Sequence, residues 1–257
     1  MANERLRSCI AAARLTIADV AAHVAVDPKT VERWITTERV PHRSHRWMTA
    51  ALLKVDEAYL WPGSLDDRGV KSASEAEFVK LYTHRGAVPG ELWRSMIESA
   101  TDRIDVLVFA GLFLPDGYPE LAKALVSKAE RGTKIRLALG DPSSDAIRLR
   151  GEEERIGDGL AARARLSLIY LQDAIGVPGV ELRLHSTTLY NSIYRFDQDM
   201  LVNTHVFGAP AAQSPVLHLR RITGGRLFDH YQASFERVWE LASPATMPEA
   251  LSRKETR

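Results

Sequence analysis

The sequence predicts two domains of different class: an all-α N-terminal domain, followed by an α/β C-terminal domain built on a mixed sheet. Residues 4–61 carry apolar side chains at helical spacing, and residues 62–74 are rich in Gly, Ser, Pro and Asp. Strand-like and helix-like segments alternate from residue 91 onward. The expected limits are 1–62 for the first domain, 63–74 for a linker, 75–243 for the second domain and 244–257 for a tail.

The composition is that of an ordinary globular protein, with 257 residues of which 45% are hydrophobic and 26% charged. No apolar run approaches the length of about 18 residues that a membrane-spanning helix needs. The N-terminal segment is charged and has no long apolar core, so no signal peptide is expected. A single cysteine, Cys9, excludes an internal disulfide. We therefore expect a cytoplasmic protein without membrane contact.

Start signals for two short helices stand close together in the first domain. Thr16 is a typical N-cap residue, with Asp19 in the capping-box position three residues on. Asp27–Pro28 combines an N-cap with a proline at the first helical position. The resulting helices, 17–24 and 28–36, are separated by about three residues, which is helix-turn-helix spacing. A further helix is expected over 46–55.

Positive charge is concentrated around the second of these helices. The net charge is only +1, yet residues 28–46 hold five cations and two anions. A recognition helix reads base edges with its first two turns and places cations against phosphates. DNA contacts are expected from Lys29, Thr30, Glu32 and Arg33 at the bases, and from Thr16, Arg39, Arg43 and Arg46 at the phosphates. The alternative is a generic helical bundle with a solvated charged face.

The segment LTIADVAAHVAVDPKTVERWITTERVP resembles the lambda-repressor-like (Cro/C1 or Xre) helix-turn-helix family. In that pattern Ala21 is the small residue at the helix crossing and Val26 is the apolar turn position. Val31 and Trp34 face the core. The resemblance implies binding to double-stranded DNA, and two-fold symmetry favours a homodimer because a single helix-turn-helix makes few base contacts.

The second domain is expected to alternate strands and helices around a mixed sheet. Residues 141–159 are polar and are expected to form a loop. Strands are expected at 104–114, 133–140, 180–185, 188–196, 200–207 and 216–221, and helices at 91–100, 119–131, 160–174 and 225–242.

This order of elements over residues 91–242 resembles one half of the phospholipase D-like fold. The catalytic motif of that superfamily is HxKxxxxD, in which the histidine attacks phosphorus and the lysine neutralises the oxyanion. Aligned on YNSIYRFDQDMLVNTH, Tyr190 replaces the histidine, Ser192 replaces the lysine and Asp197 matches the aspartate. An alignment that begins at His185 also lacks the lysine, and no lysine occurs from 135 to 253. The domain is therefore expected to be catalytically degenerate and the protein not to be an enzyme.

Polar side chains nevertheless recur at alternate positions of the last strands, where they share one face of a sheet. If the strands are neighbours, these side chains form a polar cleft that suits a small anionic ligand such as a phosphate or a carboxylate. The alternative is a set of solvent-facing sheet residues, and His185 is expected to be structural. The predicted cleft residues are Tyr190, Ser192, Asn203, His205, His218 and Arg220.

The favoured hypothesis is a sequence-specific transcriptional regulator whose C-terminal domain dimerises and senses a small anionic ligand. No cofactor is implied, and neither HExxH nor CxxC occurs to indicate a metal site. The first alternative is a phosphodiesterase or nuclease targeted by the helix-turn-helix, with His205 or His185 as nucleophile and Arg220 in place of the lysine. The second alternative is a module whose main partner is another protein.

Overall fold

The computed structural model describes residues 3–37, 39–62 and 67–245. The chain divides into two compact units, which are described separately. The first comprises residues 1–76 with 222–226, and the second comprises 77–221 with 227–257. A tail was expected over residues 244–257. Of these, residues 246–257 lie outside the described part of the chain.

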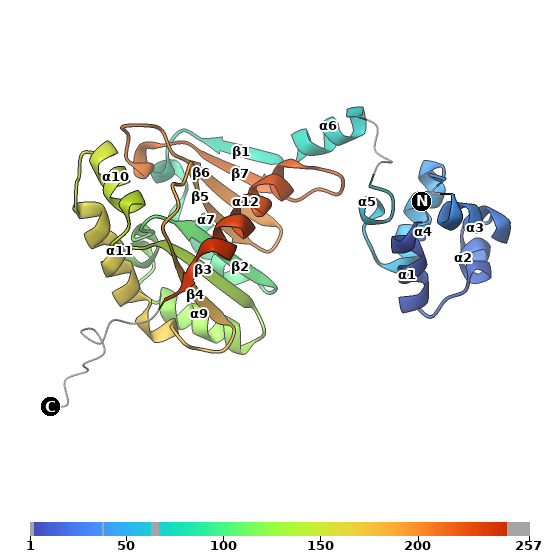
Figure 1. Ribbon diagram of the computed structural model, residues 1–257, viewed down its shortest axis with the longest axis horizontal. Coiled ribbons are helices and arrows are strands. Elements are labelled where there is room, and N and C mark those ends of the chain that lie inside the picture. The colour runs from blue at the N-terminus through green and yellow to red at the C-terminus, as the bar shows by residue number, and fades with distance from the viewer. Residues whose placement is uncertain (1–2, 38, 63–66, 246–257) are drawn as a thin grey trace. The chain divides into compact units, whose positions relative to one another are not determined.

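The first unit is helical, as predicted (Figure 1). Thr16 and Asp19 form the predicted capping box, and Asp27 accepts a hydrogen bond from the Lys29 N–H at 2.8 Å. Proline occupies the first turn of α3, also as predicted. The helices are α1 (Glu4–Ala12), α2 (Ile17–His23), α3 (Pro28–Thr36), α4 (Arg43–Leu53), α5 (Glu57–Leu60) and α6 (Asp67–Ala76).

The turn between α2 and α3 has the packing that the helix-turn-helix pattern requires. Ala21 is only 1% exposed, and its carbonyl accepts a hydrogen bond from the Val26 N–H at 3.0 Å. Ala25 adopts a left-handed backbone conformation with φ of 56°. Trp34 is 2% exposed and packs edge-on against Trp61, so it is a core residue as expected. The α2–α3 pair is therefore held rigidly on a common apolar core.

The expected linker differs from the structure, because its described part, from Asp67 onward, is the helix α6. The segment contains Ser and Gly, but it also contains Ala, Lys and Glu, which favour a helix. Lys71 and Glu75 form an i,i+4 ion pair at 3.8 Å. At its end, Glu77 accepts hydrogen bonds from the first two N–H groups of α12. Residues 63–66 of the expected linker lie outside the described part of the chain.

The second unit contains an eight-stranded mixed sheet in the order β1-β7-β6-β5-β2-β3-β4-β8. Strands β2, β3 and β4 are parallel, and the other neighbours are antiparallel. The predicted class of a mixed sheet covered by helices is therefore confirmed. The strands are β1 (Phe78–Tyr82), β2 (Arg103–Val108), β3 (Lys134–Gly140), β4 (Val180–His185), β5 (Asn191–Phe196), β6 (Asp199–Thr204), β7 (Val216–Arg220) and β8 (Ser243–Pro244).

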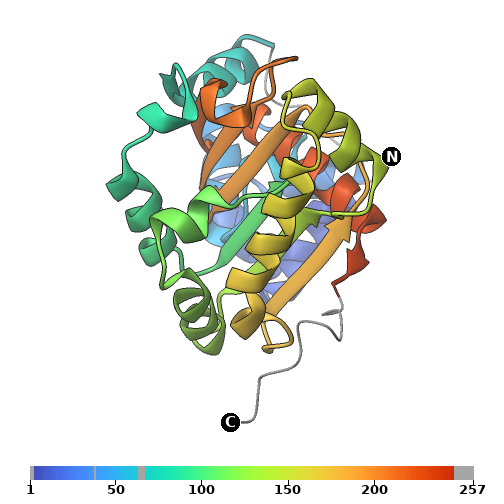
Figure 2. The ribbon, with the colours of Figure 1, turned by 90° about the vertical axis from the view of Figure 1, so that its left-hand side faces the viewer.

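Helices cover both faces of this sheet. One face packs against α7 (Gly90–Ser99), α8 (Phe113–Gly117) and α9 (Leu121–Glu130), and the other against α10 (Asp145–Glu153) and α12 (Leu227–Leu241). Helix α11 (Gly159–Tyr170) contributes to both apolar clusters. Figure 1 shows α12 across the near face of the sheet, and Figure 2 shows α10 and α11 in front of the strands.

Several elements of this unit were missed or predicted wrongly, and one missed element is the two-residue strand β8, which includes Pro244 of the expected tail. The strand expected over 104–114 ends at Val108, because Gly111 takes a φ of 70° and the chain turns into α8. The loop expected over 141–159 contains α10, which Ser144 caps by accepting a hydrogen bond from the Ile147 N–H. Strand β1 was not expected, because it pairs only with β7, a partner far away in sequence.

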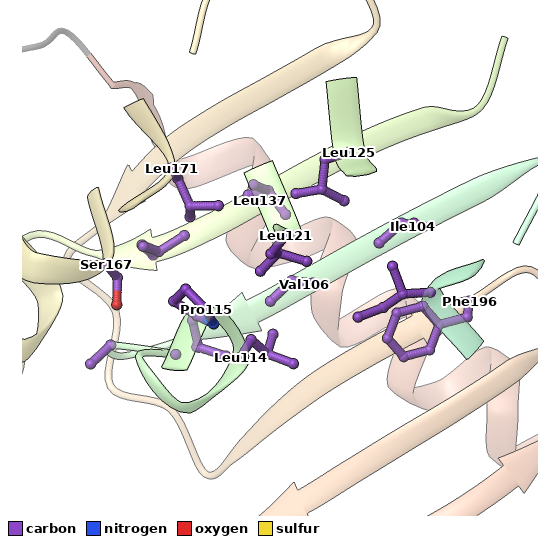
Figure 3. A pocket seen from close by; sticks show the side chains of 15 residues that line it. Ile104, Val106, Leu114, Pro115, Leu121, Leu125, Leu137, Ser167, Leu171 and Phe196 are labelled. Carbon is purple, nitrogen blue, oxygen red and sulfur yellow. The ribbon is translucent and has the colours of Figure 1, made fainter. Parts of the chain in front are cut away.

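The face under α8 and α9 encloses a small apolar cavity of about 30 Å³ (Figure 3). Ser167 supplies an oxygen there, and that hydroxyl already donates to the Arg163 carbonyl at 3.1 Å. Side chains such as Val106, Leu121 and Leu137 make up the wall. A void this small and apolar offers no chemistry for a polar ligand.

Candidate functional site

The carboxyl ends of β2, β3 and β4 meet at one edge of the sheet, where β5 begins and β6 ends. Crevices at this edge of α/β sheets are the usual ligand sites. A pocket of about 290 Å³ opens there, and we call it the sheet-edge pocket. Its polar and aromatic wall includes Arg85, Phe109, Phe113, Ser192, Tyr194 and His205.

Ser192 and His205 form a hydrogen-bonded pair in this pocket. The Ser192 Oγ lies 3.1 Å from His205 Nε2, and His205 Nδ1 lies 3.2 Å from the Leu189 carbonyl. A carbonyl only accepts hydrogen bonds, so the proton of the neutral ring is on Nδ1. Nε2 is therefore an acceptor, and the Ser192 hydroxyl donates to it. The ring also stacks on Phe109, with centroids 5.6 Å apart.

Tyr194 and Arg85 lie in the same pocket wall as this pair. Burial raises the pKa of the Tyr194 hydroxyl, and the neighbouring Arg85 charge opposes that rise. The wall thus places a buried phenol and a guanidinium beside the Ser192–His205 pair.

Both histidines near the pocket are held neutral. Burial lowers the pKa of His205 to about 4; the hydrogen bond to Leu189 opposes this, and the charges of Arg150 and Arg85 add to it. Burial likewise lowers the pKa of His185, whose ring donates to the Val108 carbonyl at 3.0 Å and accepts from the Thr187 N–H. His185 is 1% exposed and ties β4 to β2, as its expected structural role requires.

Of the six predicted cleft residues, the structure brings only Ser192 and His205 together in the pocket. Tyr190 is 82% exposed, because it precedes β5 and only its carbonyl takes part, accepting from the His205 N–H. Asn203 is fully buried, and its amide donates to the Ser214 and Pro215 carbonyls at 3.1 Å each. Asn203 therefore anchors the β6–β7 connection and does not face a ligand.

His218 and Arg220 belong to a different cluster. His218 Nε2 lies 2.7 Å from an Asp199 carboxylate oxygen, and Arg220 contacts the same carboxylate at 3.0 Å. Asp199 begins β6, whereas His205 follows its end, so about 20 Å of strand separates the two places. The expectation that all six side chains share one cleft was wrong, because a common face of a sheet does not imply a common end of its strands.

Asp197, the aspartate matched to the family motif, has a backbone role. Its carboxylate accepts hydrogen bonds from the N–H groups of Thr101, Asp102 and Arg103 at 2.7–2.9 Å. Burial raises the pKa of Asp197, but these N–H donors outweigh it and leave the pKa below its usual value. The residue thus fixes the start of β2.

Sequence reasoning missed two polar residues of the pocket that matter most. Tyr194 lies two residues after Ser192 on β5, so strand alternation alone would have included it. Arg85 comes from the short helix Arg85–Ala87 before α7, and no local pattern connects it with β5. Only the sheet order brings these segments together.

The predicted base-reading side chains lie at the start of α3. Lys29, Glu32 and Arg33 are exposed and Thr30 is partly exposed. Positions 29 and 33 share one face of the helix. Arg39 and Arg43 are also exposed, and within the described part of the chain none of these four basic residues has an ion-pair partner. The first unit therefore presents four exposed basic side chains, two on α3 and two after the end of that helix.

Two predicted phosphate contacts are already engaged. The Arg46 guanidinium pairs with Glu57 at 2.6 Å and donates to the Pro41 carbonyl, and its side chain is only 12% exposed. It braces α4 against α5, so the structure removes it from the phosphate-binding set. Thr16 was expected to place backbone N–H groups near a phosphate, and its own N–H and its hydroxyl both donate to the Asp19 carboxylate at 2.7 Å.

No family model and no curated protein matches the sequence. Among solved structures, the chain is similar to TrmBL2, an archaeal chromatin protein described as showing a novel mode of DNA binding. That match has 16% identity and a TM-score of 0.40, and covers 66% of this chain and 55% of the other. The chain thus spans about half the length of that protein. It is also similar to Nuc, a phospholipase D family member from Salmonella typhimurium, with 14% identity, a TM-score of 0.38 and coverage of 60% and 89%.

Within the described residues, no helix is long and apolar enough to cross a bilayer. No group of three or more His, Cys, Asp or Glu side chains in the same residues is arranged to hold a metal ion.

Proposed function

We propose that the protein is a sequence-specific DNA-binding transcriptional regulator of the Xre type. The observation that carries this proposal is the α2–turn–α3 unit, in which a closely packed crossing at Ala21 presents Lys29 and Arg33 outward. Exposed cations on the first two turns of a second helix suit the major groove, and Arg39 and Arg43 suit the flanking phosphates.

The C-terminal unit is proposed to dimerise and to sense a small anionic ligand. Strand β1 supports the dimer, because it is an edge strand with three half-exposed apolar side chains, Phe78, Val79 and Leu81. Such edges are normally covered. The sheet-edge pocket supports the sensor, because it combines an apolar wall with Arg85 and neutral polar groups.

We propose no phosphodiesterase activity for this unit. The competing nuclease hypothesis needs His205 or His185 as nucleophile and Arg220 as the cation. Arg220 on β7 pairs with Asp199 at the start of β6, whereas His205 follows the end of β6. His185 is 1% exposed, and both of its ring nitrogens are hydrogen-bonded. The Ser192–His205 hydrogen bond is the feature that favours some enzyme activity, since it resembles a nucleophile with its base. Against it, a histidine with a pKa of about 4 is a weak base at neutral pH.

Genome-wide mapping of the DNA bound by the protein tests the regulator proposal. A regulator recovers a small set of related sites, whose affinity falls steeply with salt as counterions are released. Recovery of random DNA, or of none, contradicts the proposal. Capture of one abundant protein without DNA favours the interaction-module hypothesis.

A further inference from the structure

The sheet-edge pocket contains a cation that the surrounding residues leave without an anion. Arg85 is partly buried, its guanidinium lies 4.1 Å from the centroid of the Phe113 ring, and it lines the pocket together with Tyr194. Among the described residues, no carboxylate lies within ion-pair distance of it. By contrast, the buried or partly buried Arg136, Arg150 and Arg195 each contact at least one carboxylate.

The two carboxylates that line the pocket do not compensate this charge. Glu154 is paired with Arg150 at 2.8 Å. Asp116 is exposed to solvent on α8, and the second lining arginine, Arg163, is exposed on α11. A partly buried cation without a counterion is unfavourable, so an anionic group from a ligand stabilises it. Arg85 thus supplies one uncompensated positive charge, which suits a ligand group that carries one negative charge.

The hydrogen bonds of the pocket favour a carboxylate over a phosphate. The Ser192 hydroxyl donates to His205, and His205 donates to the Leu189 carbonyl. Neither of these two neutral groups has a donor left for an anion. A phosphate needs donors for three oxygens, whereas the two oxygens of a carboxylate are satisfied by one guanidinium fork.

Much of the remaining wall is apolar and favours an apolar ligand body. The Phe113 ring lies against Arg85, and the Phe109 ring lies against His205. Val108, Leu160 and Pro210 add aliphatic surface, and the volume of about 290 Å³ limits the ligand to a small molecule. We propose that the sheet-edge pocket binds a small organic monocarboxylate, with its carboxylate on Arg85 and its apolar body between Phe109 and Phe113.

Titration of the full chain with small carboxylates tests this proposal. The probes are acetate, butyrate, benzoate and phenylacetate, with benzamide and phenyl phosphate as the uncharged and doubly charged counterparts of benzoate. Calorimetry and thermal shift at neutral pH give the affinities. We expect saturable binding of at least one carboxylate with an apolar body, binding at least tenfold weaker for phenyl phosphate, and none for benzamide.

The variant Arg85→Gln is expected to weaken carboxylate binding at least tenfold. Arg237→Gln, which removes an exposed arginine of α12, is the matched control and is expected to bind as the wild type does. Arg85→Lys keeps the positive charge but lacks the two parallel N–H donors of the guanidinium, so its carboxylate affinity is expected to lie between those of the wild type and Arg85→Gln. If Arg85→Gln does not fold, Arg85→Lys replaces it as the test variant. Equal carboxylate affinity in the wild type and both Arg85 variants overturns the proposal. Preference for phenyl phosphate, or no binding of any carboxylate at millimolar concentration, overturns it too.

The carboxylate proposal rests on the sensor function proposed above for the same pocket. The two are separated by measuring DNA binding independently of the ligand. Carboxylate binding without DNA binding contradicts the regulator and leaves the pocket assignment standing. DNA binding without any carboxylate affinity contradicts the pocket assignment alone.

Discussion

The neutral His205 makes the stability of the C-terminal unit depend on pH. In the folded protein the pKa of His205 is lowered to about 4, mainly by burial, from an ordinary value near 6.5. Below about pH 6.5 the unfolded chain binds a proton at this ring that the folded chain does not bind. This stabilising contribution is therefore complete above pH 6.5 and is lost as the pH falls toward 4.

The magnitude follows from these two pKa values. Between about pH 7.5 and about pH 5, linkage gives a loss of about 2 kcal/mol in the free energy of unfolding. His185, whose pKa burial also lowers, contributes in the same direction, so wild type alone does not isolate His205. The variant His205→Gln removes the titrating ring and keeps polar atoms near Ser192 and Leu189.

Urea unfolding of the full chain at the two pH values, followed by tryptophan fluorescence, measures the effect. We expect His205→Gln to reduce the pH-dependent loss of stability by about 2 kcal/mol relative to wild type. The exposed His230→Gln on α12 is the matched control and is expected to leave that loss unchanged. If His205→Gln retains the wild-type pH dependence, His205 is not held neutral and the assigned direction of the Ser192–His205 hydrogen bond is wrong.

Four further predictions follow from the structure. Arg43→Ala is expected to weaken binding to all DNA sequences and to reduce the salt slope by about one, which affinity measurements at several salt concentrations check; loss at the cognate site alone contradicts the phosphate role. Ala25→Gly is expected to stabilise the N-terminal unit by up to about 1 kcal/mol, because the exposed Ala25 has a φ of 56°, and a lower melting temperature contradicts this. A fragment that begins near Ser72 is expected to fold and dimerise, and sedimentation as a monomer at micromolar concentration assigns any dimer to the first unit. The purified protein is expected not to hydrolyse phosphodiesters or single-stranded DNA, and turnover that His205→Ala abolishes promotes the nuclease hypothesis.

Local signals in the sequence predicted the first unit well. The capping box at Thr16 and the Asp27–Pro28 start are encoded within four residues each, so the positions of α2 and α3 follow from short-range chemistry. Helix α10 was missed because charged side chains, such as Arg148 paired with Glu152, dominate its exposed face. Few of its residues are buried, among them the apolar Ala146 and Ile147, so the apolar pattern of a helix is weak in this segment.

The candidate site was predicted only in part, because it depends on contacts between distant segments. Strand alternation placed Ser192 on the correct face, but not at a position along the sheet relative to Arg220. That position is set by the register of β6 against β5 and β7, which sequence periodicity does not contain. Arg85 enters the pocket from a segment more than a hundred residues before Ser192. The unpaired charge of Arg85 became visible only in the fold.

The most direct test of the central claim is a comparison of base preferences between wild type and Arg33→Ala. The assay measures affinity for the mapped site and for every single-base variant of it. Arg33→Ala is expected to cost about 1–3 kcal/mol at the cognate site and to relax the preference at one base pair. Arg7→Ala, which removes an exposed arginine of α1 paired with Glu4, is the control and is expected to leave the preferences intact. An unchanged base preference in Arg33→Ala, with unchanged affinity, contradicts the assignment of α3 as the recognition helix.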